Sequence, residues 1–161
     1  MSTLLTVSAV VLYDAAGQIL LVRKRGTSKY MQPGGKPEQD EAPVQAAIRE
    51  LHEELGLTFT PDSLTDRGQW RGAAANEPGT ELLAYVFDAA LADAVRPAGG
   101  LANDAGSVTV RAELEDALWV TPAVAAERGD LAPLLTESVL PRLIRSPEHL
   151  TRPTRQANWV R

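Results

Sequence analysis

The chain has 161 residues, 44% of them apolar, which suffices for one hydrophobic core and leaves little room for two independent domains. Its formal charge of -5 argues against a protein that coats nucleic acid, because that class needs a basic surface to displace counterions from phosphates. The sequence has no cysteine, so disulfides and thiolate metal sites are excluded.

The start of the chain predicts a β-hairpin. Residues 6–12 and 19–23 have the apolar, β-branched composition of strands, and residues 14–17 between them form a turn sequence. Residues 27–40 follow, and their proline, glycine and polar content predicts a loop.

Targeting signals are not evident. Residues 4–12 lack the basic start and the cleavage site of a signal peptide, and no apolar run approaches the roughly 20 residues of a membrane span. We therefore expect a cytoplasmic protein with no membrane partner.

A helix is predicted over residues 44–55. At about 100° per residue its apolar side chains fall within one arc of about 60°, which defines a core-facing stripe. The stripe consists of Val44, Ile48, Leu51 and Leu55. Gly56 should end the helix, because glycine readily adopts the left-handed backbone found just past a helix terminus.

Further strands are expected near residues 68–71, at 81–87 and at 117–120. Residues 88–106 are rich in alanine, glycine and proline and show no period, so we expect a long, exposed and mobile connection. A short extended segment is expected at 107–111.

The C-terminal part predicts two helices. Thr121 and Pro122 form an N-cap and a first-position proline for a helix that runs through residue 127. Residues 131–140 are also expected to be helical, with Pro141 kinking or ending that helix. We predict one domain over residues 1–145 and a polar, loosely held tail over 146–161.

Three carboxylates gather on the polar side of the predicted helix at 44–55. Glu50, Glu53 and Glu54 are spaced three and four residues apart, so they rise from neighbouring points of one face. Arg49 offsets only part of their repulsion. A glutamate-rich face is usually solvated surface, but a hard divalent cation with oxygen ligands would also satisfy this cluster. The helix alone leaves both interpretations open.

The residues that flank the cluster favour the cation, because with them the sequence resembles the Nudix box of the Nudix hydrolase superfamily, which includes the MutT-like enzymes. The complete box spans residues 35–57. Its fixed positions are Gly35, Glu41, Arg49, Glu50, Leu51, Glu53, Glu54, Gly56 and Leu57. The resemblance implies the α/β Nudix fold, an α/β/α sandwich around a mixed β-sheet.

The resemblance implies metal-assisted attack of water on a pyrophosphate linkage. Mg²⁺, with Mn²⁺ as an alternative, would be held by the carboxylates of Glu50, Glu53 and Glu54 and by the backbone carbonyl of Gly34. Cations bridging phosphate oxygens neutralise their charge and acidify bound water, which is what this reaction requires.

The catalytic assignments follow from the same resemblance. Arg49 would fix a box carboxylate by a forked hydrogen bond. The general base is left open between Glu50, Glu53 and Glu113. Glu113 precedes the predicted strand at 117–120. An exposed loop glutamate without a catalytic role would give the same sequence pattern.

Other residues have weaker assignments. Glu41 is interpreted as structural, through the helix dipole at the start of the helix. Arg23 and Arg25, together with Lys24, are predicted to bind a distal phosphate, although a solvated strand end would carry the same charges. His52 is expected to be a surface residue. The aromatic residues Trp70, Tyr85 and Phe87 would stack on a base or, more commonly for strands, fill the core.

The expected substrate is a small-molecule nucleotide and not a nucleic acid polymer. Nucleoside triphosphates, including oxidised ones, fit best, with cleavage to the monophosphate and pyrophosphate. Alternatives are an ADP-ribose or nucleotide-sugar pyrophosphatase and a non-catalytic Nudix-fold nucleotide sensor, which would usually lose box carboxylates. An isopentenyl diphosphate isomerase shares the fold but would need a catalytic cysteine. The family often dimerises, so a homodimer is compatible with the resemblance.

Overall fold

In the computed structural model, which describes residues 3–95, 101–102 and 108–151, the apolar start of the chain forms the central strand β1 (Thr3–Tyr13). Successive side chains of a strand point to opposite faces. Ala9 and Val11 pack into one hydrophobic cluster, and Val10 and Leu12 pack into another on the other face. The strand is therefore buried on both sides, and the two clusters require a cover on each face of the sheet.

The sheet is mixed, as the sequence predicted. β1 pairs in parallel with β5, and its other pairings and those at the sheet edges are antiparallel. The short strand β3 (Gly34–Gly35) also pairs with β1. The order across the sheet is β4 (Leu64–Ala73), β5 (Thr80–Ala90), β1, β2 (Ile19–Lys24) and β8 (Leu114–Val120).

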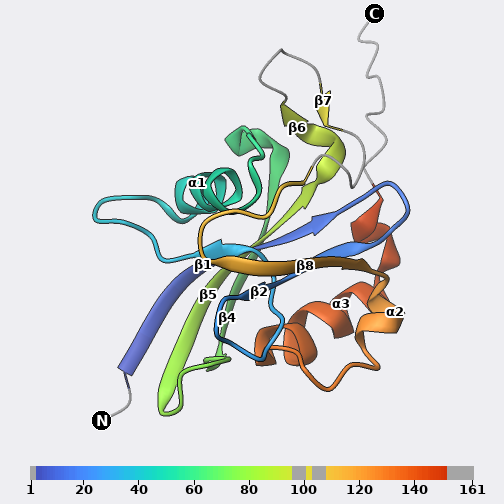
Figure 1. Cartoon of the computed structure of the whole chain (residues 1–161). Coiled ribbons are helices and arrows are strands. Elements are labelled where there is room, and N and C mark those ends of the chain that lie inside the picture. The colour runs from blue at the N-terminus through green and yellow to red at the C-terminus, as the bar shows by residue number, and fades with distance from the viewer. Residues whose placement is uncertain (1–2, 96–100, 103–107, 152–161) are drawn as a thin grey trace, which may run out of the picture.

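Helices cover both faces of the sheet and complete the predicted α/β/α sandwich. Figure 1 shows α1 (Pro43–Leu55) on one side, with α2 (Pro122–Ala125) and α3 (Leu140–Arg145) on the other. A π-helical segment, η4 (Leu135–Val139), leads directly into α3. Smaller elements are the 3₁₀ turns η1 (Pro61–Ser63), η2 (Leu91–Asp93) and η5 (Pro147–Leu150) and the two-stranded ribbon of β6 (Ala94–Val95) and β7 (Leu101–Ala102). Among the described residues, no helix combines the length and apolar composition that crossing a membrane requires.

Two predicted elements of the first half are confirmed. β1 and β2 form the expected hairpin, and the Asp14 carboxylate closes its turn by accepting hydrogen bonds from the backbone N–H groups of Ala16 and Gln18. In α1, Leu51 and Leu55 are fully buried, and Val44 and Ile48 are partly buried against the same cluster. The predicted apolar stripe therefore docks α1 onto the sheet.

The prediction of a long exposed connection from residue 88 is wrong for its first part. β5 continues through Ala90, and Leu91 and Ala94 are buried in the α1-side cluster. Small alanine side chains obscured the pattern, although they pack well between larger neighbours. Residues 96–100 and 103–107 lie outside the described part, and residues 108–111 form no strand.

Pro141 was predicted to kink or end a helix, and it does not end it, because the chain stays helical to Arg145. In an α-helix a proline ring clashes with the carbonyl four residues earlier, and the wider π-helical segment just before Pro141 moves that carbonyl away. Thr121 caps α2 as predicted, by accepting a hydrogen bond from the Val124 N–H, but α2 ends at Ala125.

The C-terminal tail is described only in part. Leu150 is buried in the hydrophobic cluster that also contains Leu140 and Leu143 of α3. Residues 152–161 lie outside the described part of the chain. The division into a domain of residues 1–145 and a tail of 146–161 stays a prediction.

A buried ion-pair network ties α3 to the sheet. Asp88 on β5 is 3% exposed, and its carboxylate accepts 2.8 Å hydrogen bonds from Arg67 Nε and from both terminal nitrogens of Arg142. Arg142 comes from α3 and Arg67 from β4. One carboxylate thus joins three elements.

Replacing Asp88 by alanine should lower the free energy of unfolding by about 3–5 kcal/mol, because two guanidinium groups lose a buried counter-charge. Urea denaturation measures this loss. Glu81→Ala is the matched control, since Glu81 lies on the same strand and pairs with Arg71 at the surface, where water screens the pair. Equal losses in the two variants would contradict the structural role of Asp88.

Candidate functional site

Two adjacent glycines bring the chain unusually close to both β1 and α1. Gly34 has φ 149°, and a Cβ atom there would overlap the carbonyl oxygen of Ser8. A Cβ atom on Gly35 would overlap the carboxylate of Glu50. Glycine is therefore required at both positions, since a side chain at Gly34 would push the loop away from β1 and one at Gly35 would displace the Glu50 carboxylate.

Glu54 is buried against this glycine pair and does not belong to a solvated helix face. Its side chain is 1% exposed, and Oε2 accepts a long 3.4 Å hydrogen bond from the Gly34 N–H. Its Oε1 has no hydrogen-bond partner among the described residues. Burial, and next the charge of Glu50, raises the pKa of Glu54 to about 8. The carboxylate therefore favours a proton or a cation at neutral pH.

Glu50 lies beside Glu54 and is also withdrawn from water. Burial raises its pKa, and hydrogen bonding and charge from Arg49, at 3.0 Å, act in the opposite direction. Glu54 is buried and Glu50 is partly buried, and the two carboxylates lie on the same side of α1, four residues apart. Their position beside each other, withdrawn from water, makes them candidate ligands for a cation.

Arg49 holds the outer carboxylates in place. It donates two 2.9 Å hydrogen bonds to Glu41 in a forked arrangement and a third to the Lys36 carbonyl. This pairing lowers the pKa of Glu41 to about 2. Glu41 is thus a structural partner of Arg49, and no side chain caps the start of α1. Arg49 also contacts Glu53 at 3.3 Å, but the Glu53 side chain is 50% exposed.

The carboxylate donors fit a divalent cation such as Mg²⁺, which needs few protein ligands. No group of three or more histidine, cysteine, aspartate or glutamate side chains is arranged to hold a metal among the described residues. Mg²⁺ is commonly held by one or two carboxylates, with waters and substrate phosphates completing its shell. Glu50 and Glu54, with the unpaired Oε1 of Glu54, match that need, whereas Glu53 stands at the outer edge.

The C-terminal end of α1 is fixed by backbone hydrogen bonds. Gly56 adopts the predicted left-handed conformation with φ 68°, and its N–H bonds the His52 carbonyl. The carbonyls of Glu54 and Leu55, in the last turn of the helix, accept hydrogen bonds from the backbone N–H groups of Arg111 and Thr109, respectively. Residues 108–111, predicted as an extended segment, thus cap the helix that carries the acids.

A charged cleft of about 740 Å³ opens beside the glycine pair. Glu113 and Lys24 form an ion pair of 3.2 Å on its wall, and the Glu113 carbonyl accepts a hydrogen bond from the Arg25 N–H. Its charged lining residues are Lys24, Arg25, Lys36, Glu50, Glu77 and Glu113. Arg25, Glu50 and Glu113 therefore meet in one place as predicted, and Glu53 does not line this cleft.

Arg23 lies away from the charged cleft. It pairs with Glu115 at 3.0 Å, donates to the Thr27 carbonyl and lies over the ring of Tyr30. Of the three basic residues that the sequence assigned to a distal phosphate, Lys24 and Arg25 line the cleft and Arg23 does not.

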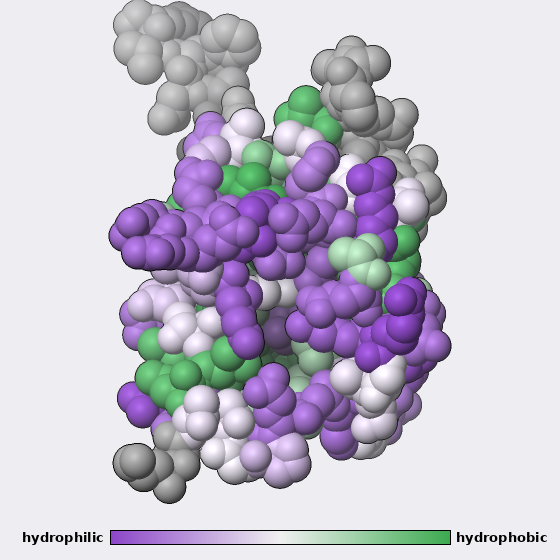
Figure 2. Space-filling view, turned by 60° about the vertical axis from the view of Figure 1, so that its left-hand side comes forward, coloured by the Kyte–Doolittle hydropathy of each residue, from purple (hydrophilic) through white to green (hydrophobic). Residues whose placement is uncertain are grey.

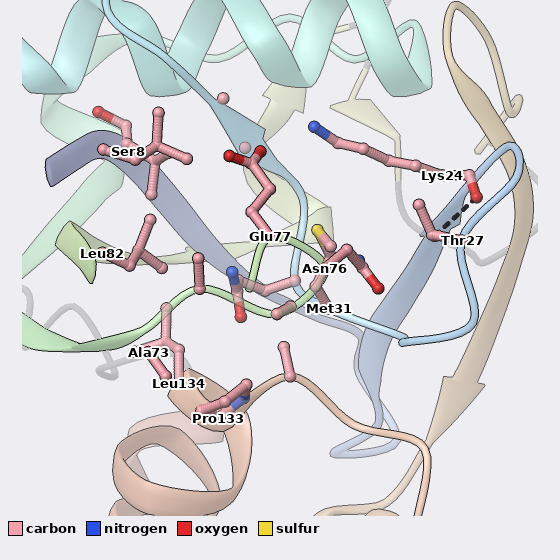
Figure 3. A pocket seen from close by; sticks show the side chains of 18 residues that line it. Ser8, Lys24, Thr27, Met31, Ala73, Asn76, Glu77, Leu82, Pro133 and Leu134 are labelled. Carbon is pink, nitrogen blue, oxygen red and sulfur yellow. Dashed lines mark hydrogen bonds between the residues drawn. The ribbon is translucent and has the colours of Figure 1, made fainter. Parts of the chain in front are cut away.

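An apolar cavity of about 250 Å³ adjoins the charged cleft and shares Leu5, Val7, Lys24, Thr27, Gly35 and Glu77 with it. Figure 3 shows Lys24 and Glu77 pointing toward the α1 side of the cavity, with Pro133 and Leu134 at the opposite end. On the molecular surface, a recess separates a hydrophilic band from hydrophobic surface below it (Figure 2). The site thus consists of the charged cleft and, next to it, the apolar cavity.

Three lining residues had no role in the sequence predictions: Gln32, Asn76 and Glu77. Asn76 and Glu77 belong to the β4–β5 connection, whose composition is that of an ordinary turn. Gln32 precedes the glycine pair, and its type gave no signal.

The three aromatic residues and His52 lie outside both hollows. Phe87 is buried beneath α1, Tyr85 packs against the same cluster, and Trp70 packs on the opposite face, so none lines the cleft or the cavity. His52 is exposed, with its ring 3.5 Å from the Thr58 hydroxyl.

Comparison with known proteins gives one family. The family model described as NUDIX domain matches residues 3–141. Among solved structures, the MutT protein of Methanosarcina mazei Go1 aligns with a TM-score of 0.68 at 22% identity, covering 91% of this chain and 97% of that protein. At this identity the likeness shows a shared fold.

Curated relatives are similar over shorter parts of their length. The isopentenyl-diphosphate Delta-isomerase of Streptomyces griseus is 35% identical over 132 residues, which cover 78% of this chain and 61% of the isomerase. The phosphatase NudJ of Escherichia coli K12 is 40% identical over 67 residues, covering 40% of this chain and 42% of the phosphatase. The chain therefore spans less than two thirds of these relatives.

Without metal, the stability of the protein should fall as pH rises. The pKa of Glu54 is raised from 4.5 to about 8, so the folded state keeps a proton that the unfolded chain releases. This stabilisation is complete below about pH 4.5 and is lost as pH rises through about 8. The slope should be on the order of 1 kcal/mol per pH unit.

Urea unfolding in EDTA between about pH 5 and pH 9 measures the slope. Glu54→Gln should flatten it, because the amide does not titrate, and Glu53→Gln should not, because Glu53 is half exposed. A slope that persists unchanged in Glu54→Gln would show that other groups cause it.

Proposed function

The chain belongs to the NUDIX domain family, and from this we propose that it is a metal-dependent pyrophosphohydrolase that cleaves a phosphoanhydride bond of a nucleoside diphosphate derivative. The observation that carries the proposal is the pair of Glu54, which is buried, and Glu50, which is partly buried, beside Gly34 and Gly35. One carboxylate oxygen of Glu54 has no partner in the described part of the chain. A surface helix would not bury an acid in this way, since isolated buried carboxylates are unfavourable.

A divalent cation, Mg²⁺ or Mn²⁺, bound by Glu50 and Glu54 would neutralise phosphate charge and make a water molecule more acidic. Glu53 and the Gly34 carbonyl stay predicted ligands of the cation, and Glu53 would reach it from the exposed edge of the site. Arg49 keeps Glu50 oriented by its 3.0 Å contact. The carboxylates are thereby held in place before substrate arrives.

Substrate phosphates would enter the charged cleft. Lys24, Arg25 and Lys36 line it and supply positive charge next to the acids. We propose that Glu113 accepts the proton of the attacking water, because it lines the same cleft and is 59% exposed, so that water screens its ion pair with Lys24. Glu50, in contrast, is held by Arg49 and assigned to the cation site. Arg23 has no direct part in this scheme.

Nucleoside triphosphates are the proposed substrate class, cleaved to the monophosphate and pyrophosphate. The apolar cavity next to the cleft is suited to the organic half of such a molecule. ADP-ribose and nucleotide sugars are the alternative class, and a nucleotide sensor without turnover is the second alternative. A cytoplasmic location and a homodimer remain predictions from the sequence.

The similarity to an isomerase of isopentenyl diphosphate gives a second candidate substrate, an isoprenoid diphosphate. The largely apolar lining of the cavity would tolerate a hydrocarbon. Isomerisation itself is disfavoured, because the sequence has no cysteine to act as catalyst. Isopentenyl diphosphate therefore belongs in any substrate screen.

The proposal predicts metal-dependent release of pyrophosphate or phosphate. A screen with Mg²⁺ should include nucleoside di- and triphosphates, nucleotide sugars, ADP-ribose, dinucleoside polyphosphates and isopentenyl diphosphate, and nucleoside triphosphates should be hydrolysed best. EDTA should abolish turnover, and added Mg²⁺ or Mn²⁺ should restore it. Turnover that survives exhaustive chelation would overturn the metal mechanism, and nucleotide binding without turnover would favour the sensor.

Substitution of Glu50 or Glu54 should reduce turnover far more than it affects folding. Glu50→Gln and Glu54→Gln keep the side-chain shape but remove the charge, and each should lower kcat/KM by roughly 100-fold or more. Glu127→Gln is the matched control, since Glu127 is exposed and remote from the cleft. Full activity in Glu54→Gln would show that the pair of Glu50 and Glu54 is not the catalytic centre.

A further inference from the structure

The carboxamide of Gln32 is a buried polar group without an evident structural purpose. Gln32 is 8% exposed, and its Oε1 has no hydrogen-bond partner among the described residues. A buried acceptor left unpaired destabilises a fold, so such a group calls for an explanation. A leucine or methionine at this position would fill the same space without that penalty.

The backbone around Gln32 is firmly held, so its side chain starts from a fixed point. Met31 exchanges two hydrogen bonds with Val22, of 2.7 and 2.8 Å, and the Pro33 carbonyl accepts one from the Val10 N–H. Gln32 is therefore anchored between two strands of the sheet, in the wall of the apolar cavity. Groups that select a ligand are most effective when they are held rigidly in this way.

Three other polar side chains of this wall are occupied. The Ser8 hydroxyl donates to the Pro43 carbonyl at 2.7 Å. The Thr27 hydroxyl donates to the Lys24 carbonyl at 2.8 Å (Figure 3), and Lys24 is paired with Glu113 at the side of the charged cleft. Asn76 and Glu77 also line the cavity, but Asn76 is only partly buried and Glu77 is exposed. The amide oxygen of Gln32 is thus a buried acceptor without a partner among the described residues, in a mostly apolar hollow.

We propose that Gln32 determines specificity by pairing with the edge of a nucleobase in the apolar cavity. A carboxamide presents an acceptor oxygen and a donor nitrogen side by side, which complements a ring edge with an N–H donor next to an acceptor. The cavity has a volume of about 250 Å³, just below the range of about 300–1,000 Å³ that pockets for whole small molecules span. It therefore suits a part of the substrate, such as one flat heterocycle. A hydrocarbon chain offers no donor and leaves the oxygen unpaired.

This inference rests on the proposed function, because it places the phosphates of the same substrate in the charged cleft. Its consequence is a preference for base-bearing over base-free triphosphates. A site built around an amide rejects ligands that leave that amide unpaired.

The first test compares nucleoside triphosphates with a base-free ribose 5-triphosphate in the wild type, Gln32→Met and Gln69→Met. Gln32→Met should lower kcat/KM for the best nucleotide about tenfold and leave the base-free probe unchanged. Gln69→Met makes the same chemical change at an exposed position of β4 and should affect neither. Gln32→Leu repeats the test with a shorter apolar side chain.

Thermal unfolding without ligand separates selection from a structural role. If Gln32 serves the ligand, Gln32→Met should melt at the same or a higher temperature, because an unpaired buried acceptor is removed. A lower melting temperature together with an equal loss on both probes would overturn the inference and assign Gln32 to the fold.

Binding of nucleoside monophosphates by calorimetry gives an answer that needs no turnover. The wild type should bind them about tenfold more tightly than Gln32→Met does, and ribose 5-phosphate equally in both. If the wild type cleaves no phosphoanhydride, the proposed function is refuted. The difference in monophosphate affinity between the wild type and Gln32→Met still tests the role of Gln32 in that case. Equal monophosphate affinities in the two proteins would refute the role of Gln32 even if hydrolysis is observed.

Discussion

Burial of the Glu54 carboxylate against two glycines is the constraint around which the site is built. The contact requires that position 34 carry no side chain, because β1 lies directly behind it, and that α1 dock closely through Leu51 and Leu55. Within the described residues, the contact leaves the acid with one weak hydrogen bond and no ion pair. The folding free energy supplied by the apolar stripe thus maintains a carboxylate in surroundings where its charge is poorly solvated. That disfavoured state is the basis for the proposed cation site.

The four glutamates of the motif are not equivalent, although they share one short segment. Glu41 is bound by both arms of Arg49 and is strongly acidic, whereas Glu54 behaves as a weak acid because it is buried. Glu50 is influenced by both neighbours, since burial raises its pKa and Arg49 opposes that rise. One arginine therefore divides the segment into a structural side and a reactive side, which a charge count along the helix does not reveal.

The sequence predicted the fold class, the hairpin, the apolar stripe and the residues of the motif, because each depends on local periodicity or on glycine. It did not predict that Glu54 is buried while Glu53 is exposed, since that depends on where the loop of Gly34 crosses the helix. Residues 88–95 were misjudged because alanine fits both exposed and buried positions. The proposed role of Gln32 depends on the hydrogen bonds that neighbouring side chains make elsewhere. Those bonds form only in the assembled sheet, so the sequence does not reveal them.

The parallel pairing of β1 with β5 has a consequence for how the chain reaches its native state. Thr3 pairs with Thr80 and Tyr13 with Ala90, so the central ladder joins segments that are far apart in the chain. Such contacts close a long loop before they give any stabilisation, which slows folding relative to a meander of hairpins. During synthesis the first strand leaves the ribosome long before its partner. Until β5 emerges, an apolar segment that is later buried on both faces is exposed to water and to chaperones.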